Sequence, residues 1–220
     1  MKKLSLFIAL LLCGNLAISQ QLFIEAFSGY NSTAYDLEGY ESTGYVPIGF
    51  RVAGGLEHVQ LGVEYRQNIT NPEFTFEGGD PVAPIIREEF EETYYGGFIR
   101  GNLSSLPAYR FGLVLKAGAG FYNTKRSVFD LPSDVLQRDA SFEYDKKFGY
   151  NVGIGISAPI WTILHWEIGY QFNAAERDEV MALSIPGYKA YYHSFQMGLS
   201  LNMVFGNTEK KCRRVISSGR

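Results

Sequence analysis

Two of the three histidines stand beside residues that could take part in proton transfer. Hydrolysis or acyl transfer needs a nucleophilic hydroxyl, a histidine base and a carboxylate that orients the histidine. His165 and Glu167 are two residues apart, so on a β-strand they would share a face, but the sequence places no serine beside them. His193 and Ser194 are adjacent, so on a strand they would point to opposite faces and could not pair. We therefore expect no catalytic site.

Metal-binding patterns are equally weak. The chain has two cysteines and no Cys-x-x-Cys motif. His58 and His165 begin strands that fall third and seventh in the eight-strand order predicted below, so a shared metal is not expected. Acidic residues gather in 31–44 and 67–92, where carboxylates could hold Ca²⁺ or Mg²⁺, but they lack a defined ligand spacing. We expect no metal and no cofactor.

Charged residues of both signs recur at alternate positions within otherwise apolar stretches. Between Tyr109 and Tyr122, the odd positions are apolar throughout and the even positions are small or charged. Alternate side chains of a strand point to opposite faces, so these charges would gather on one face. Unpaired charges are costly in a low dielectric, so we expect a salt-bridged network. Its candidate members are Glu25, Arg51, Glu64, Arg66, Arg100, Arg110, Lys116 and Glu167.

The elements that would position these residues are strands. Beyond residue 20 the chain shows no convincing 3.6-residue period, whereas period-2 alternation recurs. The hydrophobic fraction of 46% excludes a disordered chain, and the absence of 18 consecutive apolar residues excludes a helical membrane protein. The predicted strands span 22–30, 46–53, 59–66, 93–103, 109–122, 148–157, 164–173 and 191–205.

The connections between these strands alternate in length. Short links are predicted at 54–57, 104–108 and 159–163, and long ones at 31–44, 67–92, 123–147 and 174–189. Short turns at one end and long loops at the other, with an even strand count, are typical of an outer-membrane β-barrel. A soluble barrel could use the same alternation with its apolar set inside. The charge density of the polar set favours a narrow polar lumen, so we predict an all-β, eight-stranded, antiparallel, up-and-down transmembrane β-barrel.

Aromatic residues stand near the predicted strand ends. Aromatic rings favour the boundary between hydrocarbon and water, so we expect a girdle at each membrane interface. The girdle near the long loops would contain Tyr30, Tyr45, Tyr65, Tyr94, Tyr95, Phe121, Tyr122, Phe148, Tyr150 and Phe172. The girdle near the short turns would contain Phe23, Tyr109, Trp161, Trp166 and Phe205.

Residues 1–19 have the pattern of a cleaved signal peptide. Lys2 and Lys3 precede an apolar run of about ten residues, too short to span a bilayer, and small residues precede a predicted cleavage after Ser19. A lipoprotein signal would need a small residue before Cys13, where Leu12 stands. We therefore divide the chain into a signal peptide (1–19), an outer-membrane β-barrel (20–205) and a basic periplasmic tail (206–220).

The predicted mature chain is acidic and has one cysteine. Removal of Lys2 and Lys3 lowers the net charge from −3 to −5, and Cys212 alone remains, so no intramolecular disulfide is expected. No basic patch is large enough to argue for nucleic acid binding. The basic tail is expected to be solvated, with docking on anionic headgroups or a partner as the alternative.

The last strand carries the most specific motif. The pattern is a polar residue, any residue, glycine, two residues of any type, and then hydrophobic residues at alternate positions. It is matched by Gln196, Gly198, Leu201 and Met203, and Phe205 continues the alternation. With this motif and the architecture of 20–205, the chain resembles the small eight-stranded outer-membrane β-barrels of Gram-negative bacteria, in particular the "outer membrane protein beta-barrel domain" proteins common in Bacteroidota. Many members end at the terminal aromatic residue, whereas this chain continues through 206–220.

The resemblance implies localisation in the outer membrane, contact with membrane lipid and lipopolysaccharide, and recognition of the last strand by the barrel assembly machinery. We expect a non-enzymatic protein with an envelope structural role, or one that binds an unknown ligand or mediates adhesion through its long loops. One alternative is a narrow pore for ions or small solutes, gated by lumen salt bridges. Eight strands enclose just enough space for side chains, which favours a plug over a pore. A lipid A-modifying enzyme, an activity known from some barrels of this size, is the third possibility.

Overall fold

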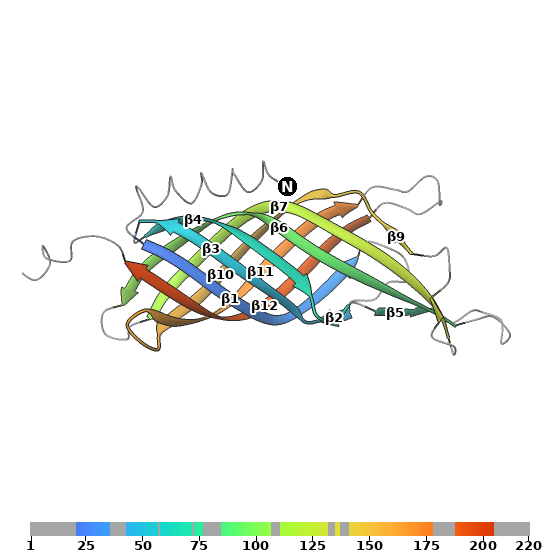
Figure 1. Ribbon diagram of the computed structural model, residues 1–220, viewed down its shortest axis with the longest axis horizontal. Coiled ribbons are helices and arrows are strands. Elements are labelled where there is room, and N and C mark those ends of the chain that lie inside the picture. Colours follow the sequence, from blue (N-terminus) through green and yellow to red (C-terminus); the bar gives the residue numbers. More distant parts are fainter. Residues whose placement is uncertain are drawn as a thin grey trace, which may run out of the picture.

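The computed structural model describes residues 21–35, 43–56, 58–71, 73–76, 85–106, 111–131, 135–136, 141–177 and 188–204. Eight long strands form a closed antiparallel β-barrel, which confirms the predicted fold class (Figure 1). Around the ring they are β1 (Gln21–Tyr35), β3 (Pro47–Gly55), β4 (Val59–Asn68), β6 (Ile85–Leu106), β7 (Phe111–Leu131), β10 (Lys147–Pro159), β11 (Leu164–Arg177) and β12 (Tyr188–Val204).

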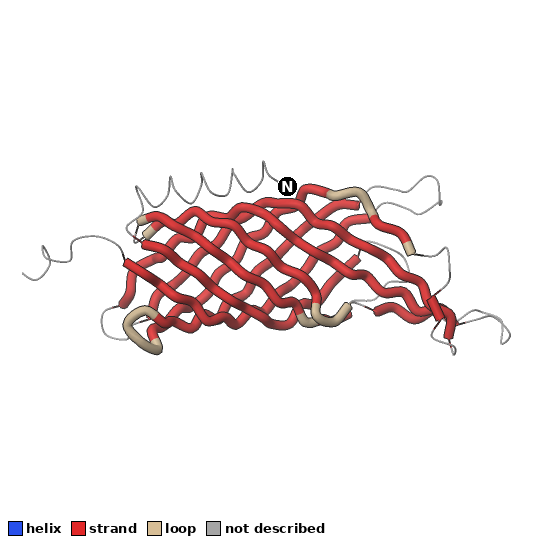
Figure 2. The backbone as a smooth tube through the Cα atoms, in the orientation of Figure 1, coloured by secondary structure: helices blue, strands red, loops and turns tan. Residues whose placement is uncertain are grey.

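The ring closes between the first and last strands. β1 and β12 pair from Gln21 and Val204 to Tyr35 and Ala190 without a register shift. Because every neighbouring pair is antiparallel, both ends of the barrel segment leave at the end that carries the short connections. Figure 2 shows the tilted strands crossing the barrel as a lattice without a free edge along the ring. Closure of this kind satisfies the ladder hydrogen bonds of every ring strand.

Two strands are much longer than the alternation predicted. β6 begins at Ile85 and β7 continues to Leu131, so parts of the predicted loops 67–92 and 123–147 are β-structure. Three short strands pair with these overhanging ends, namely β5 (Glu73–Phe76), β8 (Val135–Leu136) and β9 (Phe142–Glu143). A further short strand, β2 (Thr43–Tyr45), pairs with residues 31–33 of β1, near its long-loop end. We call β5, β8, β9, residues 85–92 of β6 and residues 123–131 of β7 the β6–β7 extension (Figure 1).

The loop prediction failed here because it rested on hydropathy. Within the overhanging part of β6, residues 87–92 are charged except for Phe90, so no apolar face marks this stretch as a strand. Cross-strand pairing nevertheless continues from Thr93 and Asn123 to Ile85 and Leu131. The strand conformation of this charged segment is therefore set by the neighbouring strand with which it pairs, and not by an apolar face of its own.

In the part of the chain that the structure describes, no helix is long and apolar enough to cross a membrane. The proposed signal peptide and cleavage after Ser19, and the basic tail, lie outside the described residues. Tyr109, Arg110 and Phe205 lie outside them as well, so the predictions for these residues stay predictions.

Candidate functional site

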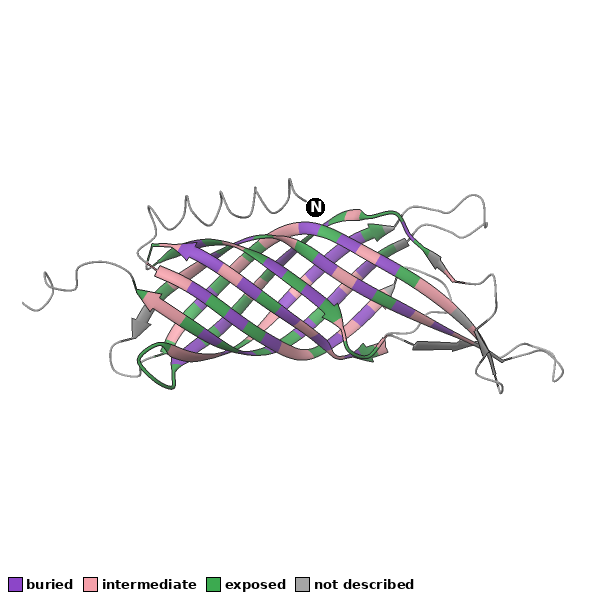
Figure 3. Cartoon of the chain, viewed as in Figure 1, coloured by how far each residue is buried: buried purple, intermediate pink, exposed green. Residues whose placement is uncertain are grey.

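The polar side chains that alternate along the strands face the interior of the barrel. Figure 3 shows buried and exposed residues alternating along the ring strands. On β3 the buried positions include Arg51 and Ala53, whereas Phe50 faces outward and is exposed. The inside-out assignment, polar within and apolar without, therefore holds for the described strands.

Arg51 of β3 is the hub of the interior. Its Nε donates a hydrogen bond to Glu64 Oε2 and its Nη1 donates to Glu25 Oε2, each at 2.8 Å. Its Nη2 donates to Gln171 Oε1 at 2.9 Å and to Gln196 Oε1 at 2.5 Å. One guanidinium group thus binds side chains from four other strands, which is the use of arginine that its planar, five-donor fork allows.

A second arginine organises the interior towards the short-turn end. Arg100 Nη2 donates to Glu167 Oε2 at 2.9 Å and Nη1 donates to Gln60 Oε1 at 3.1 Å. Its guanidinium lies 4.3 Å from the centroid of the Phe23 ring. Lys116 forms an ion pair with Glu167, and its Nζ lies 3.5 Å from Glu25 Oε2. Lys116 therefore joins the Arg100 group to the Arg51 group.

Arg66 extends the same network towards the long-loop end. Its Nη1 lies 3.7 Å from Glu64 Oε1 and donates a hydrogen bond to Asn173 Oδ1 at 3.0 Å. Its Nη2 donates to the Tyr122 hydroxyl at 3.4 Å, and the guanidinium lies 5.1 Å from the centroid of the Tyr94 ring. The structure thus connects seven of the eight predicted charges, which we call the lumen network: Glu25, Arg51, Glu64, Arg66, Arg100, Lys116 and Glu167.

Between Arg66 and the long-loop end, the interior is filled by tyrosine rings. Tyr94 and Tyr122 have ring centroids 4.7 Å apart, and Tyr122 stacks on Tyr192 at 5.9 Å. Asn151 Nδ2 donates to the Tyr94 hydroxyl at 2.9 Å, and the Tyr192 hydroxyl donates to Glu92. The tyrosines form a second plug, between the lumen network and the long-loop end.

Four predicted girdle residues were placed wrongly, because Phe23, Tyr45, Tyr94 and Tyr122 are buried inside the barrel. Their position near the strand ends suggested a girdle. Whether a residue lies on the inward or outward face depends instead on whether it is an odd or even number of residues from a known inward one (its parity). Tyr94 is an even number of residues from Arg100, and Phe23 from Glu25, so each shares the inward face of its strand. Predicted girdle residues that do face outward and are exposed include Tyr30, Tyr65, Tyr95, Phe121, Phe148, Tyr150 and Trp161.

Neutral amides complete the lumen network, and the sequence analysis missed them. Gln60, Gln171 and Asn173 are buried and accept hydrogen bonds from its arginines. Gln60 and Gln171 share a strand face with Glu64 and Glu167, respectively, so the parity of the charged residues would have identified them. Glu92, predicted in an acidic loop, is also buried.

Two residues of the predicted insertion motif belong to this interior. Gln196 accepts from Arg51 and donates through Nε2 to Ser194 Oγ at 2.9 Å. Gly198 makes room for Glu25, since a Cβ at this position would lie 2.5 Å from Glu25 Oε1. Leu201 faces outward and is exposed, and Met203 is half-buried. The polar and glycine positions of the motif thus have a packing role inside the barrel.

Two of the histidines lie near hydroxyl-bearing side chains. His193 is exposed on the outer face, and its Nδ1 lies 2.6 Å from the Tyr170 hydroxyl. The strand register places Ser200 opposite His165, a proximity that the sequence did not reveal. Ser200 is fully buried and its Oγ has no hydrogen-bond partner, so this pair is not arranged as nucleophile and base. No group of three metal-ligating side chains occurs within the described ranges.

The geometry describes a filled lumen. The six carboxylate and guanidinium residues of the lumen network are at most 4% exposed, and the Lys116 side chain is 9% exposed. These groups are therefore shielded from solvent almost completely. Four basic residues face three carboxylates, and buried Glu92 acts electrostatically on Arg66 from above. The arrangement joins the walls of the barrel through contacts across the lumen.

Compared with known proteins, the chain matches no family and no curated sequence. Its fold matches solved small eight-stranded outer-membrane β-barrels. Neisserial surface protein A aligns with a TM-score of 0.54 and 10% identity over 82% of this chain and 96% of that one. Ail of Yersinia pestis aligns with a TM-score of 0.49 and 11% identity over 84% of this chain and 100% of that one. At these identities the similarity concerns the fold.

Proposed function

We propose that the protein is a non-enzymatic outer-membrane β-barrel, in which a filled lumen stiffens the scaffold and the β6–β7 extension carries a binding or adhesive role outside the cell. The observation that carries this proposal is the combination of an apolar belt on the outside with a buried, paired charge network inside. Neither half suits a soluble protein, which would bury its apolar face and expose its charges. The shared fold with outer-membrane barrels supports the same location.

The belt has the height of a bilayer. On β7 the outward side chains run from Phe111 to Phe121 without a charge, and the next outward charge is Lys125. Ten residue steps of a strand rise about 33 Å, which at a tilt of about 40° covers roughly 25 Å of hydrocarbon. On β6, Glu91 pairs with Lys125 at the same level. The β6–β7 extension therefore begins where the belt ends.

The extension is a stiff platform rather than a plain loop. Its ladder of paired residues adds eight residue steps beyond Thr93, about 26 Å along the strand. On its outer side Arg87 pairs with Glu89 at 3.1 Å and lies 4.9 Å from the Phe129 ring centroid. On its inner side Arg126 pairs with Glu88. A surface held by strands presents its side chains at fixed positions, which supports a role in recognition.

A register-matched truncation tests the binding role. Glu73 faces Glu89 and Lys125 faces Glu143, so deleting 74–88 and 126–142 and inserting Asn-Gly at each cut would leave two tight hairpins. The deletion removes Arg87 from the pair with Glu89, and it removes both partners of the Arg126–Glu88 pair. The truncated barrel should still migrate faster in unboiled than in boiled gel samples, yet cells that display it should lose capture on protein and glycan arrays. Equal capture by both proteins would overturn the binding role of the extension.

The non-enzymatic part has its own test. A lipid-modifying activity would change the mass of lipid A in a Gram-negative host that expresses the protein. We expect an unchanged lipid A mass spectrum, because Ser200, which stands opposite His165, is buried and its Oγ has no hydrogen-bond partner. A new lipid A species that disappears in the His165→Ala variant would reverse this expectation.

A further inference from the structure

The sheet of the β6–β7 extension ends in an edge strand. β5 pairs with β6 from Glu73 and Glu89 to Phe76 and Ile86, and on this side the described sheet ends at β5. Figure 1 shows β5 alongside the protruding part of β6, beyond the ring of the barrel. On the other side of the extension, β8 and β9 comprise two residues each. With four residues, β5 is the longest edge strand in the described part of the extension.

The outer edge of β5 carries backbone groups that can pair with another strand. In an antiparallel ladder, alternate residues direct their N–H and C=O groups to one neighbour, so about half of the β5 groups point away from β6. Edge strands of natural sheets are often protected from pairing by proline or lysine. The β5 sequence, Glu-Phe-Thr-Phe, contains neither. The edge can therefore accept an extended peptide as an additional strand.

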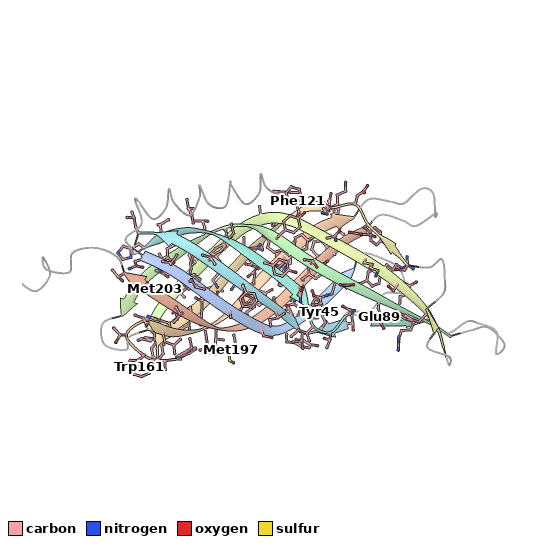
Figure 4. All side chains as sticks on the ribbon, viewed as in Figure 1. Tyr45, Glu89, Phe121, Trp161, Met197 and Met203 are labelled. Atoms are coloured by element: carbon pink, nitrogen blue, oxygen red, sulfur yellow. The ribbon has the colours of Figure 1, made fainter. Side chains whose placement is uncertain are left out.

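The residues along this edge specify the charge of such a peptide. Glu73 stands directly opposite Glu89, which lies on the protruding part of β6 (Figure 4). Glu89 has a basic partner on its own strand, since Arg87 pairs with it at 3.1 Å. Like charges directly opposite each other are unfavourable in a sheet. A basic residue on an added strand, opposite Glu73, would offset this repulsion from the other side.

The surrounding sequence has the same sign of charge. Between residues 67 and 92, seven acidic residues stand against Arg87 alone: Glu73, Glu77, Asp80, Glu88, Glu89, Glu91 and Glu92. A surface of one sign steers partners of the opposite sign towards it. Two copies of this chain paired through β5 would bring two acidic segments together. The charge therefore favours a basic peptide over a second copy as the occupant of the edge.

We infer that the outer edge of β5 binds an extended peptide by strand addition, with a basic residue opposite Glu73 and apolar residues opposite Phe74 and Phe76. The inference rests on the proposed function, because it names the class of partner that the β6–β7 extension captures. Backbone hydrogen bonds supply the affinity, and alternate side chains supply the specificity. The recognised sequence alternates basic or polar residues with apolar ones over the four residues of β5.

A labelled peptide tests strand addition on the full barrel. The probe is fluorescein-labelled Lys-Val-Thr-Val-Lys with blocked ends, whose palindromic sequence suits a parallel or an antiparallel strand. The barrel is reconstituted in phosphatidylcholine nanodiscs, which have no net charge, and binding is followed by fluorescence anisotropy. We expect saturable binding, and about tenfold weaker binding of Glu-Val-Thr-Val-Glu, since its carboxylates would stand opposite Glu73. Absence of saturable binding of the basic peptide would overturn the inference.

Backbone methylation separates strand addition from simple attraction between charges. Methyl groups on the nitrogens of both valines block one edge of the peptide, and methyl groups on the lysine and threonine nitrogens block the other edge. Neither change alters the charge of the side chains. Because an added strand pairs with β5 through one edge only, one methylated peptide should lose binding and the other should keep it. Equal affinities of the two methylated peptides, whether high or low, would contradict pairing through the backbone.

Two charge reversals locate the bound peptide. Glu73→Lys puts a basic residue on the edge and should weaken binding of the basic peptide by about tenfold. Asp145→Lys changes the net charge equally at an exposed position outside the β5 ladder, and should keep the affinity within about twofold of the parent. Equal weakening by both variants would mean that the whole acidic surface attracts the peptide, and the β5 edge would lose its special role.

The results can be told apart from a failure of the proposed function. If truncation of the extension abolishes capture on the arrays but the basic peptide does not bind, the extension binds through another surface and strand addition is wrong. If both capture and peptide binding are absent, the binding role itself fails. A dimer of the parent in detergent that Glu73→Lys dissociates would assign the edge to a second copy of the chain, against the inference.

Discussion

Lys116 and Glu25 lie on strands that face each other across the barrel, and their side chains meet in the lumen with Nζ 3.5 Å from Oε2. In the ring, three strands separate β7 from β1 in either direction. Arg66 of β4 and Asn173 of β11 stand in the same relation and are joined by a 3.0 Å hydrogen bond. The interior polar contacts therefore span the diameter of the barrel and connect walls that share no backbone hydrogen bond.

Arg51 should be the most costly member of the lumen network to remove. Arg51→Met eliminates four hydrogen bonds and leaves Glu25 and Glu64 buried with weaker partners at 3.5 and 3.7 Å. Breaking a buried ion pair by removing one partner costs about 3–5 kcal/mol. We expect a loss of that size in the free energy of unfolding, measured by urea titration in lipid vesicles.

The control for this prediction restores the charge balance. Adding Glu25→Gln to Arg51→Met removes a buried carboxylate whose only remaining ion-pair partner is Lys116 at 3.5 Å, while Glu64 keeps Arg66 and Lys116 keeps Glu167. The double variant should therefore be more stable than the single one. A double variant as unstable as the sum of both single variants would show that packing volume, rather than the unpaired charge, sets the cost.

Two neighbouring glycines of β6 should differ in how much the same methyl group costs. A Cβ at Gly96 would point into the lumen, 2.5 Å from the Ala119 carbonyl oxygen and 2.8 Å from Gly120 Cα. A Cβ at Gly97 would point outward and meet nothing nearer than 3.7 Å. Gly96→Ala should destabilise the barrel by about 1–3 kcal/mol through overpacking, and Gly97→Ala should stay within about 0.5 kcal/mol of the parent. Thermal loss of the fast-migrating gel band measures both, and equal effects would contradict the wall geometry.

The eight ring strands could be predicted because the period-2 pattern states which side chains share a face, and a closed sheet keeps that pattern on every strand. The same odd-or-even pattern assigned eight charges to one lumen, and the structure connects the seven that it describes. The pattern could not show that Arg51 reaches β11 and β12, because contacts across the lumen depend on strand stagger and side-chain length. The β6–β7 extension was missed for a different reason, since a strand beyond the belt no longer needs an apolar face.

The outward assignment makes a charge on the belt costly. Leu199 is exposed near the middle of the outward apolar run of β12, between Phe195 and Met203. Leu199→Arg should lower the free energy of unfolding by about 2–4 kcal/mol, the cost of arginine near the bilayer midplane. Asp145→Arg, at an exposed position in the long-loop region, should change it by no more than about 0.5 kcal/mol. Urea titration in vesicles compares the two, and a harmless Leu199→Arg would speak against lipid at this surface.

A Lys116 substitution tests whether the lumen is permanently closed or is a pore gated by its salt bridges. It is the most accessible member of the lumen network and bridges two groups of charges, so a gate would act through it. Lys116→Ala removes this bridge, but Arg51 still binds Glu25 and Glu64, and Arg100 still binds Glu167. Because Arg100 still reaches Glu167 of β11, and Arg51 still reaches Gln171 of β11 and Gln196 of β12, we expect neither the parent nor Lys116→Ala to show discrete conductance steps in planar bilayers. Steps that appear only in the variant, at unchanged heat-modifiable migration, would make the network a gate and the narrow pore the better account.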